Sequence, residues 1–241
     1  MDIKSILQGT PEWLAMRREF VGSSDCAAIL GVSPWTTIGQ LLDCKLGLRP
    51  QQEDNEYMKY GRETEPEARR AFEEFKGVSV YPKVVQGLEF QLASLDGISM
   101  DGQTIVEIKC PGAKDHAIAL KGQIPEKYIP QLQHILSVTG AKEIFYWSYK
   151  DGLGTMVALA RDEDYILRLV AKEKAFYDLM MEGRAKIKEH EEYLDELKNR
   201  AYGLLDGACD TAGLFSGHRG AAPFGESASE KRDEEGDRES E

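Results

Sequence analysis

The sequence predicts an α/β protein in which a mixed central β-sheet is flanked by helices. Residues 104–109 (TIVEIK) alternate and are rich in β-branched side chains, which is typical of a strand. Residues 57–76 and 129–138 have the spacing of apolar residues that predicts helices before and after it. The aromatic run 143–150 and the run 154–161 predict a second hairpin. Strands interspersed with helices in this order indicate a sheet with helices on its faces.

The remaining elements follow from capping and turn signals. Thr10 and Pro11 predict the start of a helix, because threonine caps helices and proline suits the first helical position. Residues 37–47 predict another helix, and residues 78–92 alternate as two short strands. Residues 162–199 predict one or two amphipathic helices, with Gly183 as a dividing point.

Length and composition favour a single domain over residues 1–215. A chain of 241 residues can bury one sizeable core, and the hydrophobic fraction of 41% suits a globular protein. The helices at about 162–200 are expected to pack on that domain. Residues 216–241 are rich in glycine, serine and acids, so we expect a disordered acidic tail.

The net charge of −12 argues against a broad basic surface for nucleic acid. Residues 226–241 alone account for −5 of it. The remaining charge still allows a confined basic groove within an acidic exterior. Any DNA contact is therefore expected in a restricted place.

Cysteine spacing and hydropathy narrow the class of protein further. Cys26, Cys44, Cys110 and Cys209 form no CxxC pair, which disfavours zinc and iron–sulfur sites. No run of eighteen apolar residues exists, so no membrane span is expected. The first residues have no apolar signal core. The expected location is the cytoplasm of a bacterium or of a phage-infected host cell.

Two carboxylates and an ammonium are predicted to meet at the central strand. Glu107 and Lys109 lie two apart on it, with α-carbons about 6.5–7 Å apart, and so share a face. Asp96-Gly97 is a turn signal, so Asp96 comes from the preceding strand or from a turn, and a hairpin at Asp101-Gly102 would fold it back beside Glu107. Such a group favours Mg²⁺, with Mn²⁺ as a substitute, because small divalent ions prefer oxygen ligands. The alternative is a surface hairpin with an ordinary Glu–Lys pair.

The chain resembles the lambda-type exonuclease family, also called YqaJ-like viral recombinases, within the PD-(D/E)xK nuclease superfamily. Asp96 followed by Glu107-Ile108-Lys109 matches the superfamily signature. The family order is also kept by the blocks EWLAMRREFVGSSDCAAILG, YGRETEPEARRAFE, LASLDG…VEIKCP and YIPQLQHIL. Together they span about residues 10–150. Leu95 departs from the pattern, since many relatives have proline there.

The resemblance implies a restriction-endonuclease-like core and a set of site residues. Asp96 and Glu107 would ligate the metal with the Ile108 carbonyl, and Lys109 would assist the attacking water. The acidic residue Glu65 would support a metal or water, although a charge-rich helix face is often only solvated.

Four more residues are candidates for contact with the substrate, three from the resemblance and Ser94 from its position in the sequence. Arg17 and Ser24 would hold the terminal phosphate of the digested strand, and Gln131 would lie near the active site. Ser94, beside Asp96, could contact a phosphate through its hydroxyl. The alternatives are a surface arginine, a helix-capping serine and an exposed glutamine.

These implications predict a Mg²⁺-dependent 5′-to-3′ exonuclease that acts on double-stranded DNA ends. It would leave 3′ single strands for recombination with a single-strand annealing protein. The family forms ring-shaped homotrimers, and a ring needs a basic lumen but no basic exterior. The alternatives are a structure-specific or nicking endonuclease on the same fold and a non-catalytic DNA-binding module.

Overall fold

The computed structural model describes residues 2–50 and 55–206, and side chains as far as residue 199. The chain divides into two compact units, residues 1–189 and residues 190–241. The long helix α7 (Glu163–Asp206) begins in the first unit and supplies the described part of the second. The domain limits expected from sequence, 1–215, remain a prediction, and the expected acidic tail at 216–241 lies outside the described residues.

A mixed β-sheet forms the centre of the first unit. Its strands are β1 (Asp2–Lys4), β2 (Val21–Gly22), β3 (Val80–Gln86), β4 (Gln91–Ser99), β5 (Ile105–Lys109), β6 (Glu143–Lys150) and β7 (Leu153–Ala160). The order is β1-β3-β4-β5-β6-β7, with β2 paired to β4. The pairs β2–β4 and β5–β6 are parallel, and the others are antiparallel. The predicted mixed sheet is therefore confirmed.

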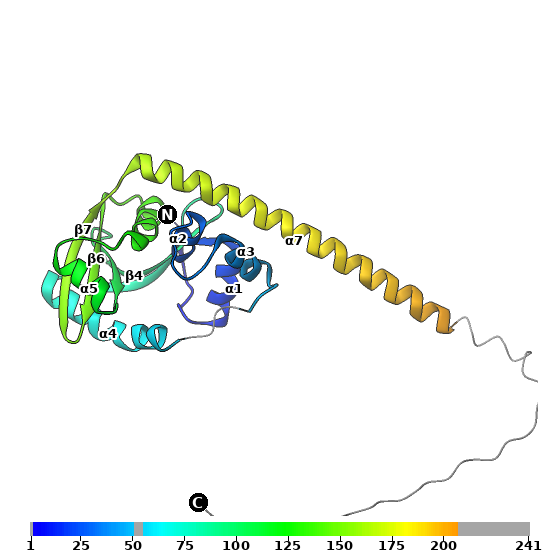
Figure 1. The fold of residues 1–241 in the computed structure, drawn as a ribbon, viewed down its shortest axis with the longest axis horizontal. Helices are drawn as coiled ribbons and strands as arrows, with labels where there is room; N and C mark the ends of the chain where they lie inside the picture. The colour runs from blue at the N-terminus through cyan, green and yellow to red at the C-terminus, as the bar shows by residue number, and fades with distance from the viewer. Residues whose placement is uncertain (1, 51–54, 207–241) are drawn as a thin grey trace, which may run out of the picture. The chain divides into compact units, whose positions relative to one another are not determined.

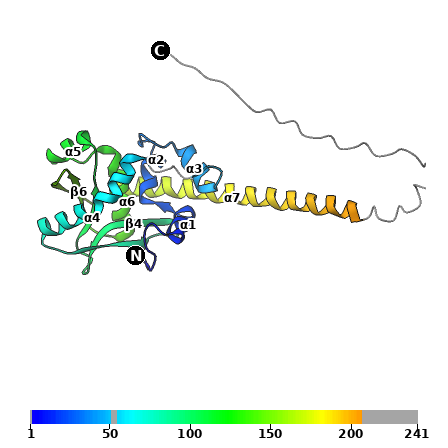
Figure 2. The ribbon, with the colours of Figure 1, turned by 90° about the horizontal axis from the view of Figure 1, so that it is seen from below.

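Helices cover both faces of this sheet (Figure 1). The helices before α7 are α1 (Pro11–Glu19), α2 (Cys26–Ile29), α3 (Ile38–Leu46), α4 (Glu56–Lys76), α5 (Ala113–Leu120) and α6 (Ile129–Thr139). Two 3₁₀ turns, η1 (Ser23–Asp25) and η2 (Glu126–Tyr128), precede α2 and α6. In Figure 2, α2 and α3 lie together at one end of the first unit, away from α5.

One face of the sheet packs on α6. Leu132, Ile135 and Leu136 of α6 are fully buried with Ile105 of β5. The start of α7 joins the same cluster through Ile166. The predicted inner face of the helix at 129–138 is thus confirmed, and it fixes α6 over the central strands.

The other face packs on α4. Ala68 and Phe72 of α4 contact a cluster that includes Val106 and Ile108. The Phe72 ring lies edge-on to Trp147 with ring centroids 5.6 Å apart. Both faces of β5 are therefore buried, which explains how Glu107, on the α6 side of that strand, comes to be 1% exposed.

One expectation about the strands was wrong. Asp96-Gly97 is not a turn, because both residues lie inside β4. Gly97 instead serves packing: a Cβ there would lie 2.7 Å from Val80 Cγ2 and 2.8 Å from Val106 Cγ1. The two strands expected at 78–92 are present as β3 and the start of β4, and β4 continues beyond them to Ser99.

The helix signals were more reliable. Thr10 caps α1, and its side chain accepts a hydrogen bond from the Trp13 amide. Gly183 does not divide α7, and a Cβ at that glycine would lie 3.0 Å from the Leu46 side chain.

Of the helices that the structure describes, none combines the length and the apolar content that crossing a membrane requires.

Candidate active site

The β4–β5 hairpin brings Asp96 beside Glu107. Gly97 pairs with Val106 and Ile98 with Ile105 across the antiparallel ladder. Asp96 then accepts a hydrogen bond from the Ile108 amide at 2.8 Å through Oδ2. The hairpin turns at Asp101 and Gly102, as expected, and Gly102 takes a positive φ of 71°. Pairing of β4 with β5 thus fixes the Asp96 carboxylate against the backbone of β5, next to Glu107.

Glu107 is held by two neighbours on its own side of the sheet. Its Oε1 forms an ion pair with Lys109 Nζ and accepts a hydrogen bond from Gln131 Nε2 at 2.6 Å. Its Oε2 is buried and has no hydrogen-bond partner. An unpaired buried carboxylate oxygen is costly, so this atom is available to a ligand.

Helix α4 supplies the third carboxylate from the opposite face. Glu65 forms an ion pair with Arg69 one turn later. Arg69 Nε also donates to the Asp96 carbonyl oxygen at 3.0 Å. The arginine therefore ties α4 to β4 and sets Glu65 next to the Asp96–Glu107 pair.

The pKa values of the three carboxyl groups are raised mainly by burial, and for Glu107 and Glu65 also by the Asp96 charge. Burial and then the Asp96 charge raise the pKa of Glu107 well above its usual range. Burial also raises the pKa of Asp96, and burial with the Asp96 charge raises that of Glu65. Burial disfavours the charge on Lys109, but the Glu107 and Asp96 carboxylates outweigh it and raise the pKa of its ammonium group. Each carboxylate would be ionised more easily beside an added cation.

The donor set fits a hard divalent cation. Two adjacent carboxylates with one unpaired buried oxygen are an all-oxygen site, and Mg²⁺ is commonly held by one or two carboxylates plus waters. The Ile108 carbonyl, the third predicted ligand, lies on β5 next to Glu107. A bound ion would both pair Glu107 Oε2 and offset the Asp96 charge that raises the pKa values of Glu107 and Glu65.

A second group of predicted residues meets at the end of α1. Arg17 donates to the Ser24 hydroxyl at 2.8 Å. The guanidinium lies over the Trp13 ring, 4.6 Å from its centroid, and Trp13 Nε1 donates to Ser94 Oγ at 2.8 Å. Arg17 thus contacts Ser24 directly and is linked to Ser94 through Trp13. In the described residues Arg17 makes no ion pair with a carboxylate, so its charge is available to an anion.

Residues 12–142 match the YqaJ-like viral recombinase domain. This is more than half of the chain. The chain belongs to the YqaJ-like viral recombinase family. The expected family is therefore confirmed, and its matched region contains every predicted site residue.

Relatives of this YqaJ-like chain agree with the assignment. It is 29% identical over 200 residues to the uncharacterized protein YqaJ of Bacillus subtilis (strain 168), covering 79% of this chain. The matched stretch spans 63% of that relative's length. The alkaline exonuclease LHK-Exo of Laribacter hongkongensis is 26% identical with a TM-score of 0.67, over 77% of this chain and all of the other.

A more distant structure supports the fold of the YqaJ-like chain alone. A phage-related exonuclease of Haemophilus somnus 129PT has a TM-score of 0.52 at 17% identity, over 68% of this chain and 96% of the other. The nuclease-type α/β fold expected from the sequence is confirmed by these solved structures.

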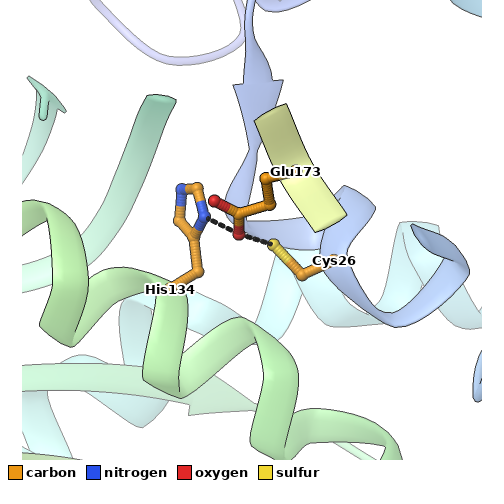
Figure 3. Close-up of side chains that lie close together, drawn as sticks. All are labelled: Cys26, His134 and Glu173. Carbon is orange, nitrogen blue, oxygen red and sulfur yellow. Dashed lines mark hydrogen bonds and ion pairs between the residues drawn. The ribbon is translucent and has the colours of Figure 1, made fainter. Parts of the chain in front are cut away.

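The YqaJ-like chain also contains a buried cluster away from the acidic pair, formed by Cys26, His134 and Glu173 (Figure 3). One possible ligand atom from each side chain lies within 4.8 Å of the other two. Among the described residues, these are the three His, Cys, Asp or Glu side chains that lie close enough together to hold one metal ion. Glu173 Oε1 meets His134 Nδ1 at 2.7 Å and the Cys26 thiol at 3.2 Å. Its Oε2 accepts from Gln91 at 2.6 Å, and His134 Nε2 meets the Leu92 carbonyl at 3.2 Å.

The hydrogen bonds of this cluster are complete without an ion. Both nitrogens of His134 face acceptors, which requires a protonated ring. Burial opposes that charge, but Glu173 outweighs it and raises the pKa of His134. The cluster therefore acts as a buried ion pair, and the acidic pair with its unpaired oxygen is the better cation site.

Several residues at these sites were not singled out from the YqaJ-like sequence. Neither Trp13 nor Arg69 was assigned a role in the site. His134 follows Gln131 by three residues, a helical spacing that places both near the sheet side of α6. Glu173 lies 39 residues further on, so no local pattern could have linked it to His134.

Proposed function

We propose that this protein is a Mg²⁺-dependent exonuclease that degrades one strand of double-stranded DNA from its 5′ end. The convergence of Asp96, Glu107 and Lys109 on two neighbouring strands carries the proposal. Family membership and the similarity to LHK-Exo, an alkaline exonuclease, favour the same activity. The 3′ single strand left behind would be a substrate for a single-strand annealing protein.

The acidic pair has the donors that phosphodiester hydrolysis needs. Asp96 and Glu107 would hold the ion together with the Ile108 carbonyl. A bound Mg²⁺ supplies an activated water and stabilises negative charge on the phosphate. Manganese, which accepts the same oxygen ligands, would substitute for it.

The surrounding side chains have separate roles in this proposal. Lys109, kept charged by its carboxylate neighbours, orients the attacking water and stabilises the charge that grows on the phosphate. Gln131 fixes the rotamer of Glu107 through its 2.6 Å hydrogen bond. Glu65 would support the metal or the attacking water from α4.

The Arg17–Ser24 corner would bind the terminal 5′ phosphate. The Arg17 guanidinium contacts a hydroxyl and an aromatic ring and makes no ion pair with a carboxylate in the described residues, so it can form two charge-assisted hydrogen bonds to a phosphate. Ser94 would add a hydroxyl, and it lies two residues before Asp96 on β4. An end-binding corner beside the acidic pair fits a 5′-to-3′ exonuclease better than an enzyme that cuts within a strand.

The acidic composition suits a ring-shaped homotrimer with DNA in its lumen. Phosphate contacts would then be restricted to the inner surface, and the net charge of −12 would be carried outside. Light scattering in solution should give three times the mass of one chain, 27.0 kDa. A monomer at working concentration would contradict the ring.

Digestion of end-labelled DNA with Mg²⁺ tests the activity. Linear duplex should be degraded from the 5′ ends, while the same sequence as a covalently closed circle should survive. Cleavage of the circle would instead indicate an endonuclease on this fold. Binding without cleavage in Mg²⁺ and Mn²⁺ would indicate a non-catalytic DNA-binding module.

A further inference from the structure

A buried ion pair lies directly behind the Arg17–Ser24 corner. Lys45 of α3 and Asp25 of η1 are 7% and 8% exposed, and Lys45 Nζ lies 2.6 Å from Asp25 Oδ2. Burying two charges costs more than burying apolar side chains of the same size, so such a pair is weak evidence for stability by itself. The position of the Lys45–Asp25 pair next to Arg17 and Ser24 points to a role other than stability.

Lys45 ties together the segments that hold Arg17. Its Nζ donates to the carbonyl oxygens of Arg17 at 2.6 Å and of Phe20 at 2.8 Å, as well as to Asp25. Three donors meet three acceptors, so the ammonium group is fully satisfied. The last turn of α1 is thereby fixed to the 3₁₀ turn that contains Ser24.

Asp25 is held on the other side by the chain itself. Its Oδ2 accepts a hydrogen bond from the Gly22 amide at 2.8 Å. Gly22 permits this contact, because a Cβ there would lie 3.3 Å from the same oxygen. Burial opposes ionisation of Asp25, but Lys45 and then Arg17 outweigh it and lower the pKa of this carboxyl.

The charge of Asp25 would otherwise compete for Arg17. Asp25 is the neighbour of Ser24, and Arg17 already acts on its carboxyl. Without Lys45, the arginine would be the remaining cation able to compensate a buried carboxylate. An arginine engaged in that way would lose much of its attraction for a phosphate.

We propose that Lys45 and Asp25 are a positioning pair for the terminal phosphate: Lys45 neutralises Asp25 and fixes the end of α1, so that Arg17 stays free to bind the 5′ phosphate. This inference rests on the proposed phosphate site and goes beyond it. Neither residue touches the substrate. The pair acts on discrimination between phosphorylated and unphosphorylated ends, and leaves the hydrolytic groups unchanged.

The test compares kcat/KM for one linear duplex with a 5′ phosphate and the same duplex with a 5′ hydroxyl. The chains are wild type, Lys45→Met, the double variant Asp25→Asn/Lys45→Met, and Lys174→Met as a control on the partly exposed face of α7. Thermal unfolding of each variant checks that it is folded. The readout is the ratio of the two kcat/KM values, which a general loss of folded protein does not change.

Lys45→Met should lower the ratio by about tenfold, because it leaves a buried carboxylate uncompensated beside Arg17. The double variant removes both charges and should recover most of the ratio, while Lys174→Met should match wild type. A folded Lys45→Met chain with the wild-type ratio overturns the inference. If that single variant does not fold, the double variant decides, and a folded double variant without the preference also overturns it.

Failure of the phosphate site itself gives a different result. If wild type has equal kcat/KM values for the two duplexes, Arg17 and Ser24 do not recognise the 5′ phosphate. That result overturns the phosphate site and this inference together. A wild-type preference that survives in Lys45→Met overturns the positioning role alone.

Discussion

Gln131 donates its side-chain amide to Glu107 Oε1 over 2.6 Å, which joins helix α6 to the central strand at its buried acid. Lys109 pairs with the same oxygen. The other oxygen, Oε2, is left unpaired. Glu107 is thus fixed from one side and open on the other, as a ligand that accepts a cation should be.

Replacing Gln131 by methionine should lower kcat by about tenfold with little effect on folding. Mutation of a residue that hydrogen-bonds a metal ligand typically lowers metal affinity or activity by about 10–100-fold. The Mg²⁺ concentration for half-maximal activity should rise in parallel. Digestion assays across a Mg²⁺ series measure both. Gln103, exposed near the hairpin turn, offers the matched control Gln103→Met, and equal effects at the two positions would contradict a role for the Gln131–Glu107 bond.

Lys109→Ala should abolish Mg²⁺-dependent digestion, with a loss of at least about 100-fold, because a charged group that acts in the transition state contributes on that scale. Circular dichroism should report a folded chain. Lys114→Ala, at an exposed position on α5, should retain full activity. Retained activity in Lys109→Ala would refute the assignment of this lysine.

Affinity for Mg²⁺ should rise with pH. Burial and Asp96 raise the pKa of Glu107, so a proton competes with the ion at low pH and is released when the ion binds. Calorimetric titration of Mg²⁺ from pH 6 to 9 should therefore show tighter binding and less proton release as the pH increases. Glu107→Gln should flatten this dependence, and an unchanged slope in that variant would place the titrating group elsewhere.

Much of the acidic site could be predicted from the sequence because its geometry is local. Asp96 and Glu107 lie on two strands of one hairpin, so the turn at Asp101-Gly102 was enough to bring them together. Gly97 was misread as part of a turn, since its function is to admit the side chains of Val80 and Val106. Sequence spacing carries no information about such a close approach.

The long-range contacts could not be predicted in the same way. Cys26 and Glu173 are 147 residues apart, and Lys45 reaches the Arg17 carbonyl from 28 residues away. Both contacts join helices that lie far apart in the sequence. A lysine on a helix is usually solvated, and no pattern distinguishes this buried one.

Gly97→Ala should destabilise the fold by about 1–3 kcal/mol, since an added methyl group would overlap Val80 and Val106. Urea unfolding measures the change. Gly112→Ala is the matched control, because a Cβ there meets nothing within 4 Å and its φ is −65°. A Gly97→Ala chain as stable as this control would contradict the observed packing.

The His134–Glu173 pair should stabilise the fold most between pH 4.5 and 6.5, the ordinary pKa values of the two groups. The pKa of His134 is raised, so its contribution is complete below 6.5 and is lost as pH increases through the folded value. Despite burial, His134 lowers the pKa of Glu173, so that contribution is present above 4.5 and is lost as pH falls through its folded value.

His134→Gln should therefore reduce the free energy of unfolding by about 3–5 kcal/mol within that window and by less outside it. Urea unfolding at a series of pH values measures this difference. His190→Gln, at an exposed position, should leave the profile unchanged. A difference between wild type and His134→Gln that does not vary with pH would show that the ring is not charged in the fold.

The β4–β5 hairpin carries Asp96 and Glu107, whereas α1, η1 and α3 carry the corner around Arg17. In the proposed function, hydrolysis and recognition of the DNA end would therefore depend largely on separate stretches of polypeptide, with Ser94 on β4 as the one phosphate-binding candidate that belongs to the hairpin. Exchanging residues 10–47 between relatives should transfer the choice of DNA terminus without rebuilding the hydrolytic centre, which makes this scaffold suitable for engineering enzymes that start from differently modified ends.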